Sequence, residues 1–335
     1  MKKKIIFLTD GSKNPNLPSR RLRVYEMIPY LRDTFDTECY PLPRTILQFL
    51  KLRKKIVSGD ILFIQKELPS FTMLLLLKLC NARIIYDFDD AVYIRHDPKN
   101  FTFKKSFKLR RRFNRICQTA NLVIAGNEIL QKQAILSGAA KTIVIPTSVE
   151  TKKNLPKIKK YKKEKTIALG WIGQRINLPY LEALESIFIK LSNQGFKFKL
   201  IVLSNEKPNF TSFTNIFYKK WSAEKESNFL NEIDIGLMPL IKNAYTEGKC
   251  AYKALQYMSY QKAVIVSDVG INAKWIKNGG ITVNSDHEMF LAIKKLINNP
   301  LLRNQLGHNG YKIIKERFDR DVISSKLKNA LQATL

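Results

Sequence analysis

Short apolar runs alternate with longer amphipathic segments along this chain. In the first half, runs rich in Ile, Val and Phe occupy residues 4–9, 38–42, 61–65, 83–87, 122–125 and 142–145. Most of these runs are apolar throughout, which is typical of strands buried on both faces of a parallel sheet. The spacing between them predicts helices over residues 20–32, 45–57, 70–80, 102–120 and 128–137. This alternation indicates right-handed βαβ units and a doubly wound sheet.

The pattern stops at residues 151–165, which are dense in Lys, contain Pro156 and have no apolar periodicity. We interpret this segment as a linker. After it, strands are predicted at residues 166–172, 198–203, 215–218, 233–238, 263–266 and 281–283. Helices are predicted at residues 178–193, 224–232, 249–260, 286–298, 300–318 and 321–331.

The chain is therefore expected to be an α/β protein with two Rossmann-like domains facing a central cleft. We place the first domain at residues 1–150 and the second at residues 166–318, with a C-terminal helix in residues 319–335 that packs back on the first domain. Ligands of open α/β sheets bind beyond the carboxyl ends of the strands. Functional residues should accordingly follow strands.

Composition changes this picture mainly through charge. The 335 residues carry a formal net charge of +30, which attracts nucleic acid, anionic lipid or phosphorylated small molecules. The four cysteines are far apart, so we expect neither a disulfide framework nor a zinc site, and a reducing cytoplasm is indicated. With three histidines in the chain, a histidine-rich metal site is not expected either. The longest apolar stretch, residues 71–80, is about half of the ~20 residues that a membrane span needs. Membrane contact would then be peripheral.

The most informative stretch combines residues 233–240, 247–258 and 263–270, a strand, a loop with a helix, and another strand. Gly248 precedes the predicted helix, where backbone N–H groups and the helix dipole favour a diphosphate, and Glu247 is adjacent. Lys249 and Lys253 are four residues apart, on one face of that helix, and Gln256 lies about one turn further. From spacing alone, an ordinary surface helix with two solvated lysines is the simpler interpretation.

The order of these pieces resembles the donor-binding core of family 4 glycosyltransferases, specifically from Trp221 to Asn272. That family has the GT-B fold and is usually retaining. Its pattern is an Asp-Ile strand ending in Pro, a loop, a helix with Glu-x7-Glu, and a further strand followed by Gly. Here the two glutamates fall on Gly248 and Gln256, so a carboxylate usually near the sugar and diphosphate is missing.

The resemblance extends to two further donor-binding segments. Gly173 and Arg175 lie at the position of the family's glycine turn after the first strand of the second domain, and Arg175 is a candidate ligand of the diphosphate. Trp221 lies in the loop that runs near the nucleotide base in the family. A packing role for Trp221 is the alternative.

Three carboxylates, Asp87, Asp89 and Asp90, gather at the end of a predicted strand. A metal-binding Asp-x-Asp motif belongs to the other, single-domain glycosyltransferase fold, so we expect no metal here. By position the segment resembles the family's strand end facing acceptor and sugar, which implies that Asp89 or Asp90 orients the acceptor hydroxyl or accepts its proton. Alternatively these aspartates cap the next turn and pair with Arg20, Arg21 or Arg95.

Two basic segments of the first domain are candidate binding elements. Ser19, Arg20 and Arg21 open the first predicted helix, where guanidinium groups could bind a phosphate or the acceptor. Residues 101–113 interleave phenylalanines with cations, a pattern that suits an anionic membrane surface. For residues 19–21, the alternative is a basic face that is exposed to solvent. For residues 101–113, the alternatives are phenylalanines that pack on the sheet, or contact with nucleic acid.

The resemblance thus implies a hexosyltransferase that moves a sugar, with retention, from a nucleoside-diphosphate sugar to a glycan, lipid-linked or other hydroxyl acceptor. We expect this reaction to belong to the synthesis of cell-surface polysaccharide or glycoconjugate. The expected location is the cytoplasm, with peripheral association at the cytoplasmic face of the membrane. No cofactor, metal or nucleic acid is expected. The alternatives are a non-catalytic GT-B-like glycan- or nucleotide-binding protein, and a nucleotide-sugar epimerase or hydrolase.

Overall fold

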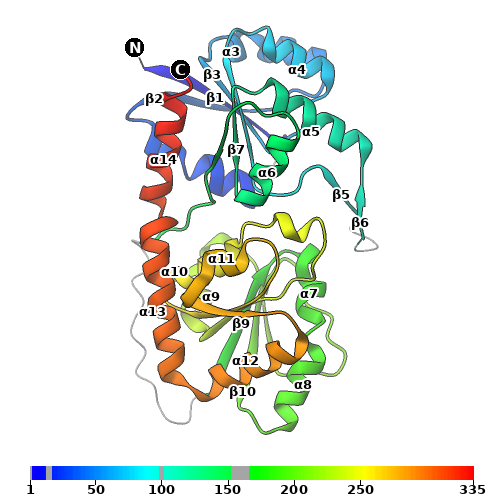
Figure 1. Ribbon diagram of the computed structural model, residues 1–335, viewed down its shortest axis with the longest axis vertical. Coiled ribbons are helices and arrows are strands. Elements are labelled where there is room, and N and C mark those ends of the chain that lie inside the picture. The colour runs from blue at the N-terminus through cyan, green and yellow to red at the C-terminus, as the bar shows by residue number, and fades with distance from the viewer. Residues whose placement is uncertain (1, 13–16, 98–101, 152–165) are drawn as a thin grey trace. The chain divides into compact units, whose positions relative to one another are not determined.

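In the computed structural model, the chain forms two compact units (Figure 1). The structure describes residues 2–12, 17–97, 102–151 and 166–335. Unit 1 comprises Met1–Ser148, Asn243–Cys250 and Arg320–Leu335, and unit 2 comprises Val149–Lys242 and Ala251–Asp319. Apart from Thr151, the predicted linker lies outside the described residues.

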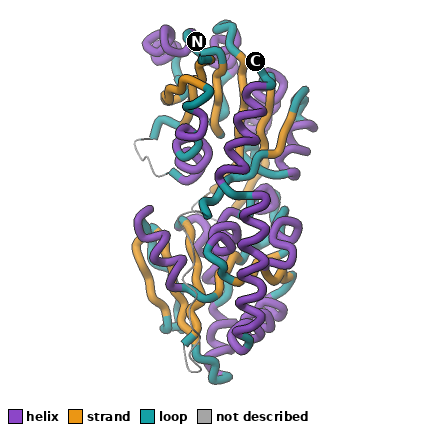
Figure 2. Tube along the Cα trace, turned by 90° about the vertical axis from the view of Figure 1, so that its left-hand side faces the viewer, coloured by secondary structure: helices purple, strands orange, loops and turns teal. Residues whose placement is uncertain are grey.

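Unit 1 is built on a six-stranded parallel sheet in the order β2-β1-β3-β4-β7-β8. In chain order its strands are β1 Lys3–Thr9, β2 Phe35–Pro41, β3 Ile61–Gln65, β4 Arg83–Phe88, β7 Leu122–Ala125 and β8 Thr142–Val144. β3, β4 and β7 are buried almost throughout, because helices cover both faces of the sheet. Figure 2 shows the strands of each unit lying together with helices packed against them. The expected parallel doubly wound sheet is confirmed.

Four helices of unit 1 begin at a side-chain cap, which explains where they start. They are α3 Ile46–Val57, α4 Phe71–Lys78, α5 Phe107–Thr119 and α6 Glu128–Leu136, capped by Thr45, Ser70, Ser106 and Asn127. The helix predicted over residues 102–120 was too long. Its first turn is strand β6, Thr102–Lys105, which pairs with β5, Ile94–Asp97, before Ser106 caps α5.

The helix predicted over residues 20–32 is broken into three pieces. They are α1 Pro18–Arg20, a π-helical segment η1 Arg21–Tyr25, and α2 Ile28–Leu31. Pro29 follows the first residue of α2 and cannot donate a helical hydrogen bond, so a continuous helix is interrupted here. The π-turn buries Leu22, Arg23 and Val24 together.

Unit 2 repeats the architecture with the sheet order β11-β10-β9-β12-β13-β14, again parallel. Its strands are β9 Ile167–Gly173, β10 Phe198–Ser204, β11 Ile216–Lys220, β12 Ile235–Met238, β13 Ala263–Ser267 and β14 Gly280–Val283. Its helices are α7 Leu178–Glu182, α8 Glu185–Asn193, α9 Ala223–Glu232, α10 Tyr252–Ser259, α11 Asn272–Ile276, α12 Asp286–Asn298 and α13 Pro300–Arg317. One apolar core joins the sheet to α8 and α12.

Two helix predictions in unit 2 were wrong in detail. The helix expected over residues 178–193 is divided into α7 and α8. The helix expected to begin at residue 249 begins at Tyr252, because Thr246–Gly248 forms a short 3-10 turn and Ala251 has a left-handed backbone, with φ of 51°. Residues 249–251 are therefore outside α10.

The last helix, α14 Arg320–Gln332, belongs to unit 1. Arg320 pairs with Glu26, and the Lys328 ammonium lies 2.7 Å from the Asp33 carboxylate. The buried face of α14, which includes Ile323 and Leu327, joins the core of unit 1. No helix in the described part of the chain is long and apolar enough to cross a membrane.

We predict that Gly307→Ala destabilises unit 2. Gly307 lies where α13 meets the turn after α10, and a Cβ there would be 2.1 Å from the Gln261 carbonyl oxygen. Relieving that contact requires a backbone shift, so the free energy of unfolding should fall by about 1–3 kcal/mol in denaturant titration despite the helix preference of Ala. Gln305→Ala, at an exposed site of α13, is the control and should change the free energy of unfolding by less than about 0.5 kcal/mol. Equal stability of Gly307→Ala and wild type would contradict the close approach.

Candidate functional site

At the carboxyl end of β3 in unit 1, the Lys66 side chain lies among polar groups from two other segments. Its ammonium pairs with the Asp90 carboxylate, lies 3.4 Å from Asp89 Oδ1 and donates to Ser19 Oγ at 2.9 Å. The Lys66 backbone has φ of 65°, which costs a non-glycine residue about 1–3 kcal/mol. Sequence reasoning missed Lys66, although a lysine directly after a buried strand was a usable signal.

The third carboxylate of the predicted cluster, Asp87, has a different partner. Buried Arg23 donates to it from Nε at 2.8 Å and also from Nη2, and its Nη1 donates to the Ile145 carbonyl at 3.0 Å and to Thr147 Oγ1 at 3.2 Å. Burial opposes the guanidinium charge, but the Asp87 carboxylate outweighs it and raises the pKa of Arg23. Asp87 thus serves the fold, whereas Asp89 and Asp90 face Lys66.

Arg20 and Arg21, two of the alternative partners expected for these aspartates, contact other carboxylates. Arg20 lies 3.5 Å from the Asp10 carboxylate and donates to the carbonyls of Asp10 and Ser12. Arg21 lies 3.8 Å from Glu26. Within the residues that the structure describes, no group of three or more His, Cys, Asp or Glu side chains is placed to hold a metal ion.

The segment Asn243–Cys250 packs with unit 1 although α10, which follows it, belongs to unit 2. Asn127 holds this segment by donating from Nδ2 to the Gly248 carbonyl at 3.0 Å and to the Lys249 carbonyl at 3.2 Å. A Cβ at Gly248 would be 3.0 Å from Ala91 Cβ. Gly248 therefore makes a close contact with unit 1 and does not begin a helix, which corrects the sequence interpretation of this glycine. Glu247 lies in the same 3-10 turn.

Lys249 also lies in this segment, so the expected helical face shared with Lys253 does not exist. Its ammonium lies 4.8 Å from the centre of the Tyr245 ring. Burial lowers the pKa of Lys249, attraction to Asp90 offsets part of this, and repulsion by Lys66 adds to it. The pKa of Lys66 is instead raised, because the carboxylates of Asp89 and Asp90 outweigh its burial.

In unit 2, the glycine turn and the α10 lysine lie together. A Cβ at Gly173, the last residue of β9, would be 2.9 Å from Lys253 Cε. The Lys253 ammonium lies 5.0 Å from the centre of the buried Trp171 ring, which keeps it beside the end of the strand. A Cβ at Gly173 would also be 2.5 Å from Trp171 Cη2, so this glycine makes room for the Trp171 ring and for Lys253. Residues far apart in the sequence thus place a cation beside the end of β9.

A second group in unit 2 links Trp221 and Gln256. The Trp221 indole N–H donates to Glu226 Oε1 at 2.9 Å, and the Gln256 amide donates to Glu226 Oε2 at 3.5 Å. Glu226 lies in the first turn of α9 and was not predicted from the sequence. Its signal was weak, since acidic residues are common in the first turn of any helix.

Arg175, two residues after Gly173, contacts the segment that follows β10. Its backbone N–H donates to Asn205 Oδ1 at 2.7 Å, and its guanidinium lies 3.2 Å from Glu206 on an exposed surface. An exposed pair of this kind contributes little to stability and leaves the guanidinium able to exchange partners.

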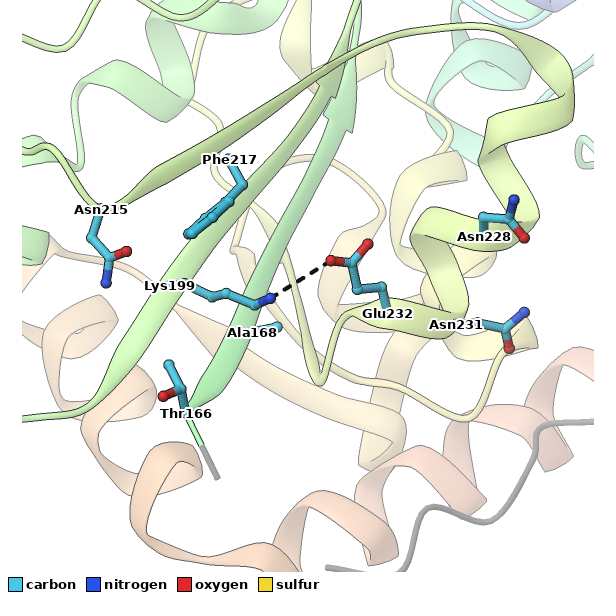
Figure 3. Close-up of a pocket in the computed structure, with 8 residues that line it drawn as sticks. All are labelled: Thr166, Ala168, Lys199, Asn215, Phe217, Asn228, Asn231 and Glu232. Carbon is cyan, nitrogen blue, oxygen red and sulfur yellow. Dashed lines mark ion pairs between the residues drawn. The ribbon is translucent and has the colours of Figure 1, made fainter. Parts of the chain in front are cut away.

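A pocket of about 830 Å³ opens at the opposite, amino-terminal end of the unit 2 strands (Figure 3). Its lining is Thr166, Ala168, Lys199, Asn215, Phe217, Asn228, Asn231 and Glu232. Lys199 and Glu232 pair across it at 3.6 Å. None of the residues predicted to bind donor lines it, and ligands of parallel sheets bind at the carboxyl ends, so we do not assign the donor to this pocket.

The sequence has no recognisable relatives in two comparisons. No protein-family model matches it, and no curated protein is similar to it.

Solved structures, however, resemble the whole chain. HepE from Anabaena, crystallised with UDP, is 14% identical with a TM-score of 0.70, over 99% of this chain and 100% of HepE. A glycosyltransferase from Rickettsia africae is 14% identical with a TM-score of 0.72, over 99% and 98% of the two chains. Sucrose-phosphate synthase from Thermosynechococcus elongatus is 12% identical with a TM-score of 0.69, over 99% of both. Together with the two six-stranded parallel sheets, these matches confirm that the chain has the GT-B fold.

Proposed function

We propose that this protein is a glycosyltransferase that binds a nucleoside-diphosphate sugar on unit 2 and transfers the sugar to a hydroxyl acceptor. The observation that carries this proposal is the close approach of Lys253 to Gly173 at the carboxyl end of β9. An anion at this edge meets the Lys253 cation at the carboxyl end of a parallel strand, where ligands of such sheets bind. The crystallisation of HepE with UDP and with UDP-glucose supports a nucleotide at this fold's donor site.

The chemistry of unit 2 suits a departing diphosphate. Lys253 stabilises negative charge as the sugar–phosphate bond breaks. Gln256 and Glu226 offer hydrogen bonds to ribose hydroxyls, and the Trp221 ring lies beside them. Arg175, Glu247 and Lys249 remain predicted donor contacts. The Gly248 backbone N–H instead donates to the Tyr245 carbonyl at 3.1 Å.

Unit 1 supplies the proposed acceptor contacts. Lys66 is a counterion for Asp89 and Asp90, which keeps carboxylate oxygens available to orient an acceptor hydroxyl or accept its proton. Ser19, Arg20 and Arg21 are the other proposed acceptor or phosphate contacts. We further propose retention, no metal, and a glycan or lipid-linked acceptor in cytoplasmic synthesis of polysaccharide or glycoconjugate. Residues 101–113 are proposed to contact an anionic membrane.

A non-catalytic nucleotide- or glycan-binding protein is the second candidate. It is favoured by Gly248 and Gln256, which replace the two glutamates of the family pattern. Gly248 packs against Ala91, so no side chain at this position can reach a sugar. A protein of this kind would bind nucleotide but leave the donor intact.

We predict that one nucleoside diphosphate, or its sugar conjugate, stabilises the protein in thermal unfolding. A panel of UDP, GDP, ADP and their sugar conjugates at about a hundred times Kd should add roughly 2.7 kcal/mol. Lys253→Ala removes one charged contact to the diphosphate and should raise Kd about 10- to 100-fold. Gln256→Ala should raise it less, because a neutral hydrogen bond contributes less than a charged one.

The matched control is Lys312→Ala, an exposed lysine of α13, which should leave Kd unchanged. Lys249→Ala tests whether the unit 1 segment contributes to donor affinity. If no nucleotide shifts the wild-type transition, or if Lys253→Ala responds like wild type, the donor site is misplaced.

We predict that Asp90→Asn slows turnover of that donor without weakening its binding. Loss of a proton acceptor should lower kcat about 10²-fold, measured as release of nucleoside diphosphate, while the Kd from thermal unfolding stays within about twofold. Asp36→Asn, an exposed aspartate of β2, is the control. An unchanged kcat in Asp90→Asn would show that Asp90 takes no part in the mechanism. If wild type leaves the donor intact with every acceptor tested, the non-catalytic candidate is favoured.

A further inference from the structure

The pocket at the amino-terminal end of the unit 2 strands forms where the cover of the sheet ends. α9 packs on β9 and β10, whereas β11 is the edge strand beyond them. Side chains alternate along a strand, so Ile216 packs on the unit 2 core and Phe217 points to the opposite face. Phenylalanine is usually buried, but Phe217 is 49% exposed. An uncovered aromatic ring therefore forms one wall of the pocket (Figure 3).

The other wall of the pocket carries amide side chains from α9. Asn228 and Asn231 are three residues apart on this helix, so they share one of its faces, and both are exposed to solvent. Figure 3 shows them across the pocket from Phe217. A third amide, Asn215, lies on the β11 side, and its Nδ2 donates to the Phe198 carbonyl at 2.5 Å. Because an amide both donates and accepts, this lining can bind hydroxyl groups in either role.

An ion pair lies between the two walls. The Lys199 ammonium is 3.6 Å from Glu232 Oε1 and 5.1 Å from the centre of the Phe217 ring. Lys219 pairs with the other oxygen of Glu232. Burial opposes the carboxylate charge, but the two lysines outweigh it and lower the pKa of Glu232. The pocket thus offers an ionised donor and an ionised acceptor, whose hydrogen bonds are stronger than those of neutral groups.

This lining disfavours two classes of ligand. A phosphate or another polyanion would meet the Glu232 carboxylate, and the lining residues carry one positive and one negative charge, which cancel. A purely apolar ligand would remove water from the amides and the ion pair without replacing their hydrogen bonds. A neutral molecule rich in hydroxyl groups suits both conditions, because its hydroxyls bind the polar groups while its C–H face packs on the Phe217 ring. Neutral sugars have this chemistry.

We propose that this pocket binds a neutral oligosaccharide at a site separate from the donor. Its volume of about 830 Å³ is within the range of ligand pockets. β9 runs for seven residues from Ile167 to Gly173, so the pocket and the Lys253 edge lie about 20 Å apart along the sheet. A sugar in the pocket therefore leaves the diphosphate edge open. Sugar binding stands independently, whereas a role in retaining a glycan acceptor rests on the proposed function.

The test is an NMR titration of the full chain with neutral tetrasaccharides of glucose, galactose and mannose, without nucleotide. Phe217→Ala removes the aromatic wall, and Asn231→Ala removes one amide. The matched controls are Phe71→Ala, at a phenylalanine of unit 1 that is 58% exposed, and Asn298→Ala, at an exposed asparagine that ends α12. An unchanged unfolding midpoint verifies that each variant is folded.

We expect at least one of these tetrasaccharides to bind wild type. Phe217→Ala should raise its Kd about tenfold or more, because the sugar loses an apolar surface. Asn231→Ala should raise the Kd about threefold, since one neutral hydrogen bond is lost. Both controls should bind like wild type. Failure of wild type to bind any of the tetrasaccharides, or wild-type affinity in Phe217→Ala, overturns the proposal.

A second titration in the presence of UDP, GDP or ADP separates this pocket from the donor site. The Kd of the tetrasaccharide should stay within about twofold, because the two sites lie at opposite ends of the strands. Competition by a nucleotide would place the sugar at the donor edge and overturn a second site. The first titration contains no nucleotide, so its failure leaves the donor-site proposal intact.

Discussion

The buried pair of Arg23 and Asp87 is the interaction on which the carboxyl end of the unit 1 sheet depends. Arg23 comes from the π-helical turn, Asp87 from β4, and the other acceptors of the guanidinium from residues 145 and 147. Removing one partner of a buried pair costs about 3–5 kcal/mol, because the remaining charge is unpaired. The pair therefore holds three segments in one arrangement. Asp89 and Asp90, which follow in the chain, are positioned as a consequence.

Lys66 and Lys249 illustrate how nearby carboxylates decide the state of a buried lysine. Asp89 and Asp90 lie close enough to Lys66 to raise its pKa above the ordinary value. Lys249 is near the same carboxylates, but burial outweighs their attraction and lowers the pKa of this lysine. The same residue type thus provides a firm cation at one position and a group that loses its proton more readily at the other.

Cations are placed in two different ways in the described part of the protein. At the carboxyl end of β9, Lys253 is placed by contact with Gly173 and Trp171, so its position is determined by packing. On α3, α4 and α5, lysines and arginines lie at the outer surface of helices whose inner stripes form the core. A positioned cation suits recognition of one diphosphate, whereas a dispersed set adds to the long-range field that attracts anions in general.

The sequence by itself determined the two parallel sheets, because strands buried on both faces must be apolar throughout and helices must alternate with them. It also singled out Gly173 and Lys253 as candidate donor contacts, because the order of elements around them resembles a known donor-binding core. Tertiary structure alone decided that the Asn243–Cys250 segment packs with unit 1, that α10 begins at Tyr252, and that Lys66 and Glu226 contact the predicted residues. Those outcomes depend on contacts between residues distant in the chain, such as Asn127 with Gly248, and local spacing carries no information about them.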